Sequence, residues 1–212
     1  MAEVKTFGVM LFEGFEVLDA FGPIEAFGIL ATLGKCRVVT VAERAGAVTS
    51  AQGTKAIADF GFTESGFNDC PPIDILLVPG GIGTRKEVTN HTALEWLIAH
   101  ASKAEIVASV CTGSSLLAKA GLLDGLRATS NKRAFKWVTE QGPKVKWVHE
   151  ARWVDDGKFS TSSGVSAGID MALAIIARII DLKTAEQIAI QMEYEWHRDA
   201  GWDPFAKIYP LK

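Results

Sequence analysis

The chain has 212 residues, of which 48% are hydrophobic, and this is enough for one α/β domain, 1–212, with a buried core. Its formal net charge is −3, with no long run of one sign, which argues against a nucleic-acid or membrane-surface partner. The three cysteines are widely spaced, which predicts free thiols and no zinc site. We find no signal peptide and no apolar segment of membrane-spanning length, and with the free thiols this predicts a cytoplasmic protein.

The first elements bring acidic side chains to the end of a strand. Residues 6–12 form an apolar run without polar alternation, typical of a central strand in a parallel sheet. A connecting segment over 15–22 follows, and the proline after it fits the first turn of a helix over 23–30. Glu16 and Asp19 therefore lie just beyond the carboxyl end of the first strand.

The remaining pattern alternates strands with helices. We expect strands over 37–42, 74–78, 106–110, 127–130 and 145–149, hairpins pairing 48–50 with 55–58 and 152–155 with 158–161, and helices over 93–100, 112–120, 133–140, 169–180 and 183–194, followed by an irregular tail. This alternation predicts a doubly wound, mostly parallel sheet with helices on both faces.

Cys111 lies between the predicted strand 106–110 and the predicted helix 112–120. A sharp strand-to-helix turn at this point would push its side chain outward and direct the free N–H groups of the helix start towards it. These groups and the helix dipole favour a thiolate, so we expect a lowered pKa and a nucleophilic Cys111. On local sequence alone, a buried structural cysteine is an equal alternative.

Four features fall at the ends of predicted strands: Asp19, the glycine cluster 80–83, Cys111-Thr112 and the segment 163–168. Ligands of open α/β sheets bind along that edge, so their convergence favours a nucleophilic role for Cys111. The glycine cluster lets backbone N–H groups approach an anion closely. It has neither GxxxxGK[ST] nor GxGxxG, which disfavours a nucleotide loop, and a plain loop remains the alternative.

Asp19 stands among apolar residues, which predicts a raised pKa and a carboxyl that carries a proton near neutrality. A capping aspartate is the alternative, and Glu16, which competes for the role, is expected to be solvated. A cysteine hydrolase would place a histidine beside its thiol, and of the four histidines only His149 is a candidate. Asp170, at the start of an apolar helix, is expected to be a structural cap.

Five segments carry a family resemblance: LDAFGP (18–23), DILLVPGGIGTR (74–85), SVCTGSSLLAKAGLLDGLRAT (109–129), SSGVSAGIDMAL (162–173) and EYEW (193–196). Over about residues 5–205 the chain resembles the ThiJ/PfpI superfamily, and it looks most like the isocyanide hydratase branch. The resemblance implies a flavodoxin-like sheet sandwiched by helices, a nucleophile elbow at Cys111, and usually a homodimer. It also implies a small-molecule substrate and no cofactor or metal.

The resemblance assigns roles to individual residues. It makes Cys111 the nucleophile and Asp19 its acid–base partner. It places the N–H and hydroxyl of Thr112 in the pocket, and gives Gly81, beside Gly80 in the PGG turn, the second N–H of an oxyanion-type site. The segment expected to lie over the cysteine consists of Ser163, Gly164 and Val165.

Asn131 departs from the superfamily pattern, in which many members carry a histidine. An asparagine cannot accept and return a proton, which weakens the protease, amidase and glyoxalase interpretations but not the hydratase one. We therefore expect an enzyme that adds water to an isocyanide, with Asn131 touching the substrate region. The alternatives are a redox-sensing or stress-protective protein acting through Cys111 oxidation, and a regulator's ligand-binding half, for which the end at Lys212 leaves no room for a helix-turn-helix module.

Overall fold

A seven-stranded sheet forms the centre of the protein. The computed structural model describes residues 4–64 and 69–211. The spatial order of the strands is β10 (Trp153–Asp156), β11 (Phe159–Ser162), β7 (Ile106–Ser109), β6 (Ile75–Val78), β1 (Lys5–Met10), β2 (Cys36–Ala42) and β5 (Phe60–Gly61). All neighbouring pairs are parallel except β10 and β11. The predicted mostly parallel sheet is confirmed.

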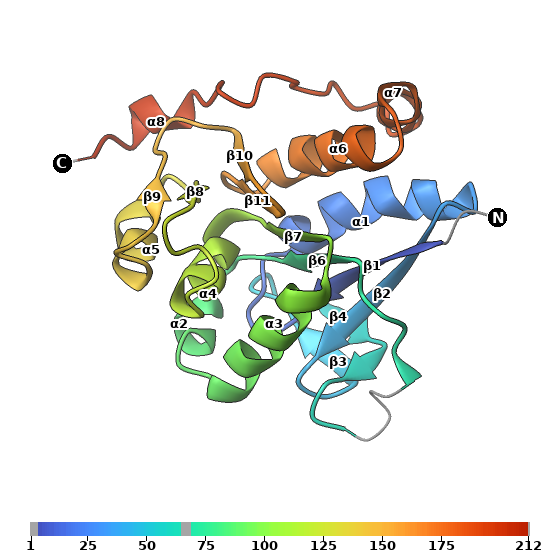
Figure 1. Ribbon diagram of the computed structural model, residues 1–212, viewed down its shortest axis with the longest axis horizontal. Coiled ribbons are helices and arrows are strands. Elements are labelled where there is room, and N and C mark those ends of the chain that lie inside the picture. The colour runs from blue at the N-terminus through green and yellow to red at the C-terminus, as the bar shows by residue number, and fades with distance from the viewer. Residues whose placement is uncertain (1–3, 65–68, 212) are drawn as a thin grey trace.

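Helices cover both faces of this sheet (Figure 1). One face carries α1 (Val17–Thr32) and α6 (Ala167–Ile179), with α7 (Leu182–Gln191) packed against α6. The other face carries α2 (Thr84–Glu87), α3 (His91–Lys103) and α4 (Ser114–Lys119). Two covered faces explain why the central strands are apolar runs rather than alternating ones.

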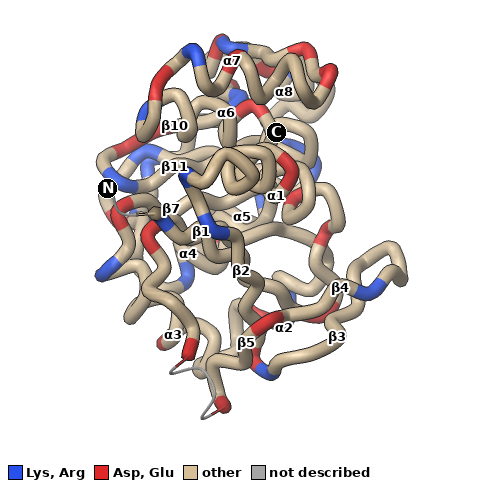
Figure 2. The backbone as a smooth tube through the Cα atoms, turned by 90° about the vertical axis from the view of Figure 1, so that its right-hand side faces the viewer, with Lys and Arg blue, Asp and Glu red and all other residues tan. Residues whose placement is uncertain are grey.

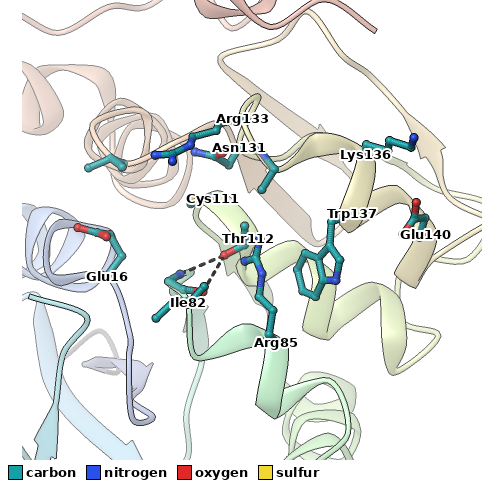
Figure 3. A pocket seen from close by; sticks show the side chains of 13 residues that line it. Glu16, Ile82, Arg85, Cys111, Thr112, Asn131, Arg133, Lys136, Trp137 and Glu140 are labelled. Carbon is teal, nitrogen blue, oxygen red and sulfur yellow. Dashed lines mark hydrogen bonds between the residues drawn. The ribbon is translucent and has the colours of Figure 1, made fainter. Parts of the chain in front are cut away.

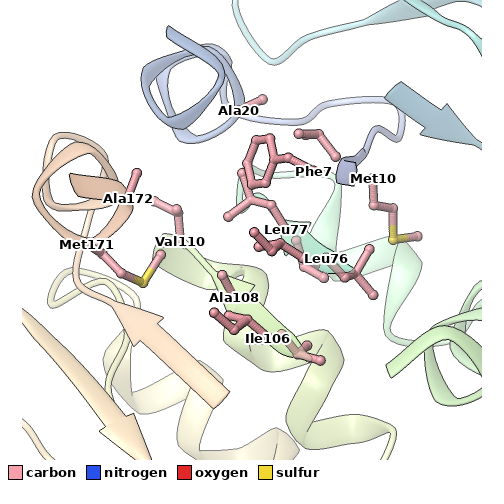
Figure 4. Close-up of a cluster of buried hydrophobic side chains, with 14 of the residues drawn as sticks. Phe7, Met10, Ala20, Leu76, Leu77, Ile106, Ala108, Val110, Met171 and Ala172 are labelled. Atoms are coloured by element: carbon pink, nitrogen blue, oxygen red, sulfur yellow. The ribbon is translucent and has the colours of Figure 1, made fainter. Parts of the chain in front are cut away.

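The core lies between these layers. All four residues of β6 are buried, and so are all four of β7. Side chains of the central strands meet those of α1 and α6, as Figure 4 shows for Leu77, Val110 and Met171. The rings of Phe7 and Phe27 stack with centroids 3.9 Å apart and fix α1 on β1.

Smaller elements lie at the margins of the sheet. They are the hairpin of β3 (Gly46–Thr49) and β4 (Lys55–Ala58), the pair β8 (Arg127–Ala128) and β9 (Lys146–Trp147), and the helices α5 (Phe135–Gln141) and α8 (Phe205–Ile208). Both predicted hairpins are confirmed, whereas α8 interrupts the tail predicted as irregular. Acidic and basic residues are interspersed along the chain (Figure 2). Among the described residues, no helix is long and apolar enough to cross a membrane.

The first helix begins earlier than the sequence predicted. It starts at Val17, so that Asp19 lies in its first turn and Pro23 lies inside it. Contacts distant in sequence fix this start, because the backbone N–H of Glu16 donates to Gly80 O (2.8 Å) and that of Val17 donates to Gln52 Oε1 (3.2 Å). The helix therefore holds Asp19 over the end of β6.

Asp170 is not a helix cap, contrary to the prediction. It is fully buried and accepts from Arg152 Nε (2.8 Å) and Nη2 (2.7 Å). Tyr194 Oη (3.1 Å) and the backbone N–H of His197 (3.0 Å) donate to its other oxygen. The ion pair thus joins the residue before β10 to α6, and the hydrogen bonds from Tyr194 and His197 attach the segment after α7 to the same carboxylate. Helix α7 ends at Gln191, short of the predicted 194, before Glu193 adopts a positive φ of 48°.

Replacing Asp170 tests this attachment. In Asp170→Asn, the buried Arg152 loses its counter-charge, so we expect the free energy of unfolding to fall by about 3–5 kcal/mol. Urea denaturation measures it, with Glu186→Gln as the control, since its exposed pair with Arg198 is worth less than about 1 kcal/mol. Equal small losses in both variants would contradict the assignment.

Candidate active site

The structure gathers the predicted strand ends along one edge of the sheet. Asp19 follows β1, Gly80 follows β6 and Cys111 follows β7, all neighbouring strands. The segment 163–166 follows β11, next to β7. The residues that sequence patterns singled out are therefore brought together.

Cys111 occupies a strained turn. Its φ is 56°, in the left-handed region that side chains rarely adopt, and it opens a 3-10 turn (Cys111–Gly113) that leads into α4 rather than one continuous helix. Its N–H donates to Ser163 O (3.0 Å), and its carbonyl accepts from Ser130 Oγ (2.8 Å) and Ser114 Oγ (3.2 Å). These bonds hold the predicted elbow in place.

Asp19 is fully buried beside Cys111. Its Oδ2 accepts from the backbone N–H of Gly80 at 2.9 Å. Its Oδ1 is buried without a conventional hydrogen-bond partner in the described part of the chain, and the Cys111 thiol is the polar group that interacts with the carboxyl. A Cβ atom at Gly80 would stand 2.8 Å from Asp19 Oδ2 and 2.6 Å from Thr112 N, so only glycine allows this approach.

The pKa values of the pair are both shifted upwards. Burial raises the pKa of Asp19 to about 7; the Gly80 hydrogen bond opposes this shift and the charge of Glu16 adds to it. Burial and the charge of Asp19 likewise raise the pKa of the Cys111 thiol. The prediction of a lowered thiol pKa was wrong, because removal from water outweighs the N–H groups near the sulfur. Near neutrality the pair retains a proton.

Two backbone N–H groups face the sulfur, from Thr112 and from Val165, and both act to lower the thiol pKa. The predicted N–H of Gly81 is not one of them, since it donates to Thr112 Oγ1 at 3.0 Å. Gly80 likewise serves Asp19 rather than an oxyanion. Among the described residues, Thr112 and Val165 are therefore the backbone donors that could stabilise negative charge at the sulfur.

The segment over the cysteine is only partly as expected. Val165 lines the cleft with a positive φ of 47°, and Gly164 lies so close to Asn131 that a Cβ atom would stand 2.5 Å from Asn131 Nδ2. The side chain of Ser163 instead donates to Asp203 Oδ2 (2.7 Å), away from the thiol. Ser163 contributes to the site through its backbone carbonyl, which accepts a hydrogen bond from the N–H of Cys111.

A cleft of about 670 Å³ opens over the thiol (Figure 3). Cys111 is only 6% exposed at its floor. Glu16 lines the cleft and accepts from Gln52 Nε2 at 2.6 Å, so it is not simply solvated as predicted. The lining residues are Glu16, Gly81, Ile82, Arg85, Cys111, Thr112, Asn131, Arg133, Ala134, Lys136, Trp137, Glu140 and Val165.

Apart from Glu16, sequence reasoning missed the charged residues of this cleft. Arg85 stands two residues after the glycine cluster, and that position was the available signal for it. Lys136, Trp137 and Glu140 come from α5, which no motif marked. His149 is absent from the lining and contacts Tyr209 O through Nε2 (3.0 Å). Within the described ranges, no group of three His, Cys, Asp or Glu residues could hold a metal ion.

Residues 5–178 match the DJ-1/PfpI family. The chain belongs to this family. It is 35% identical over 188 residues to the isonitrile hydratase of Pseudomonas putida, covering 88% of this chain and 77% of that protein. It is 33% identical over 132 residues to the transcriptional regulator GbdR of Pseudomonas aeruginosa, covering 62% of this chain but 35% of the regulator.

Among solved structures, a THiJ/PfpI family protein from Pseudomonas syringae superimposes with a TM-score of 0.80 at 30% identity, covering 91% of this chain and 76% of that one. The family and its fold are thereby established for this chain. The predicted relationship to the superfamily is confirmed.

The substitution Asp19→Asn keeps the size of the side chain but removes its ability to ionise. The folded state holds the proton up to about pH 7 and the unfolded chain only to about 3.8, so wild-type stability falls as the pH rises between these values. Asn cannot titrate, and we expect Asp19→Asn to remove roughly 2–4 kcal/mol of this pH dependence. The variant should be the more stable protein at pH 8. Urea denaturation from pH 4 to 8 measures the free energy of unfolding of the wild type and of the variant. If the two free energies changed with pH in parallel, the raised pKa of Asp19 would be contradicted.

Proposed function

We propose that this protein is an isocyanide hydratase, which adds water to R–N≡C and releases the N-substituted formamide R–NH–CHO. The pairing of the Cys111 thiol with the buried Asp19 carboxyl at the floor of a cleft carries this proposal. The similarity to the Pseudomonas putida hydratase, across most of both chains, supports it. The homodimer expected from the family resemblance and the cytoplasmic location expected from the sequence stay predictions.

The first step uses the proton that the pair holds. Asp19 accepts the thiol proton through its unpartnered Oδ1, and the Cys111 sulfur attacks the terminal carbon of the isocyanide. A carbon–sulfur bond forms, and the electron pair left on carbon takes the proton from Asp19. The product of this step is a thioimidate, R–N=CH–S–Cys111, and Asp19 is again ionised.

The second step consumes water. The Asp19 carboxylate removes a proton from a water molecule, which attacks the thioimidate carbon, and Asp19 passes this proton to the nitrogen and is ionised again. The tetrahedral adduct R–NH–CH(OH)–S–Cys111 collapses as its hydroxyl proton goes to the leaving sulfur by way of Asp19. A carboxyl with a pKa of about 7 suits both directions of transfer, because it gives and accepts a proton near neutrality.

The surroundings of the pair support hydration over the alternatives. Asn131 lines the cleft at the position where a cysteine–histidine enzyme would need a base, and it cannot carry a proton. A redox sensor needs an accessible thiolate, whereas Cys111 is 6% exposed and its thiol pKa is raised. Both observations favour a role in which Cys111 and Asp19 exchange a proton with the substrate.

Two substitutions test the proposal directly. Cys111→Ala should abolish hydration, and Asp19→Asn should lower kcat by about 10²–10⁴-fold, since it removes the acid–base group and keeps the Gly80 hydrogen bond. Conversion of phenyl, cyclohexyl and carboxymethyl isocyanides to formamides is followed by chromatography. Cys70→Ser is the matched control, because Cys70 does not line the cleft.

The wild type should convert at least one isocyanide of this panel, and Cys70→Ser should match it. Full activity in Asp19→Asn or Cys111→Ala would refute the mechanism. No conversion of any isocyanide by fully reduced wild type would refute the function.

A further inference from the structure

Arg85 is held in a fixed position in the cleft. Its guanidinium lies over the ring of Trp137, 3.9 Å from the centroid, and its Nη1 donates to Thr84 Oγ1 at 3.1 Å. Thr84 is fully buried and its hydroxyl lies 3.2 Å from Thr112 Oγ1. Figure 3 shows Arg85 between Thr112 and Trp137, beside the nucleophile. A stacked, hydrogen-bonded arginine of this kind is pre-organised to receive a ligand.

The donors of Arg85 are mostly unused. A guanidinium has five N–H donors, and in the described part of the chain only Thr84 accepts from that of Arg85. Neither Arg85 nor Arg133, another cation of the cleft, forms a salt bridge with any residue in 4–64 or 69–211. An arginine fork without a carboxylate partner is therefore open to an anion from outside the protein.

The acidic residues of the cleft lie elsewhere. Glu16 comes from the opposite side, next to α1, where Gln52 holds its carboxylate (Figure 3). Glu140 lies beyond the Trp137 ring, one helical turn after Lys136 on α5, where it offsets the charge of that lysine. The side of the cleft next to Arg85 thus keeps an excess of positive charge, although the whole chain has a net charge of −3.

We propose that the R group of the substrate carries a carboxylate, which Arg85 binds as a two-pronged hydrogen-bonded ion pair while the isocyanide carbon meets Cys111. This inference rests on the proposed function for the reacting group, and on Arg85 and Trp137 alone for the carboxylate. Arg133 adds charge from the opposite rim of the cleft. The substrate is therefore a small isocyano acid, rather than the neutral isocyanide that Cys111 and Asp19 alone would accept.

Alkylation of Cys111 tests carboxylate recognition without any isocyanide. Iodoacetate and iodoacetamide have nearly the same size, but the first carries a carboxylate and the second a neutral amide. Both form a carbon–sulfur bond with loss of iodide. In Arg85→Gln, we expect the ratio of the iodoacetate rate to the iodoacetamide rate at Cys111 to fall by about tenfold or more, since a charged hydrogen-bonded pair is lost. Peptide mass spectrometry gives the two rates. Arg85→Lys should keep part of the preference, and Arg37→Gln, at an exposed position of β2, should keep all of it.

A ratio that does not change overturns the proposal. Equal slowing with both reagents also overturns it, because Arg85 would then act on the thiol and not on the incoming anion.

Hydration assays then test whether a carboxylate on the substrate favours the reaction. The wild type should turn over isocyanoacetate with a higher kcat/KM than its methyl ester, and Arg85→Gln should raise KM for the acid about tenfold while changing the ester little. A preference for the ester overturns the proposal. Conversion of other isocyanides but not of isocyanoacetate also overturns it. If no isocyanide reacts while the alkylation ratio still depends on Arg85, the hydratase function fails and carboxylate recognition stands.

Discussion

The candidate site depends on the placement of a carboxyl and a thiol where water is almost absent. Asp19 is fully buried and Cys111 is 6% exposed, so neither can be charged without losing solvation. The charge of Asp19 raises the pKa of the thiol, burial keeps the pKa of Asp19 raised although the thiol hydrogen bond lowers it, and the pair retains a proton near neutrality. That proton is what the proposed chemistry moves, first from sulfur to carboxyl and then to carbon. A pair in open water would be ionised at the carboxyl alone and would offer no acid.

The fold supplies this placement through the edge of a parallel sheet. Three neighbouring strands end together, and each contributes one part: α1 after β1 brings Asp19, the glycine turn after β6 lets the backbone approach it, and the elbow after β7 raises the sulfur. Backbone strain at Cys111 is tolerated because serine side chains and the Ser163 carbonyl hold the turn from several directions. Arg85 and Trp137 add a polar wall in which the guanidinium forms no salt bridge with any described residue.

Much of this follows from the sequence, and the exceptions have a common cause. The central strands could be predicted from apolar runs. Asp19 and Cys111 could be predicted as site residues because they follow strands, and the carboxyl ends of parallel strands meet at one edge of the sheet. The thiol pKa was predicted with the wrong sign, since burial is a property of the packed protein and not of the helix start. Gly81 was misassigned because its N–H is taken by the Thr112 hydroxyl, a contact between distant segments. Arg85 escaped notice because its significance appears only when α5 places Trp137 beneath it.

The protonation state of Asp19 is the most direct test of the account. Infrared difference spectroscopy of protein with 13C-labelled aspartate, with Asp19→Asn subtracted as reference, isolates the carboxyl stretch of this one side chain during a pH titration. The account predicts that the protonated band disappears with a midpoint at about pH 7, and at higher pH once Cys111 is replaced by alanine, because the thiol hydrogen bond that lowers the pKa of Asp19 is then lost. A midpoint near 4, the ordinary value for an aspartate in water, would contradict it.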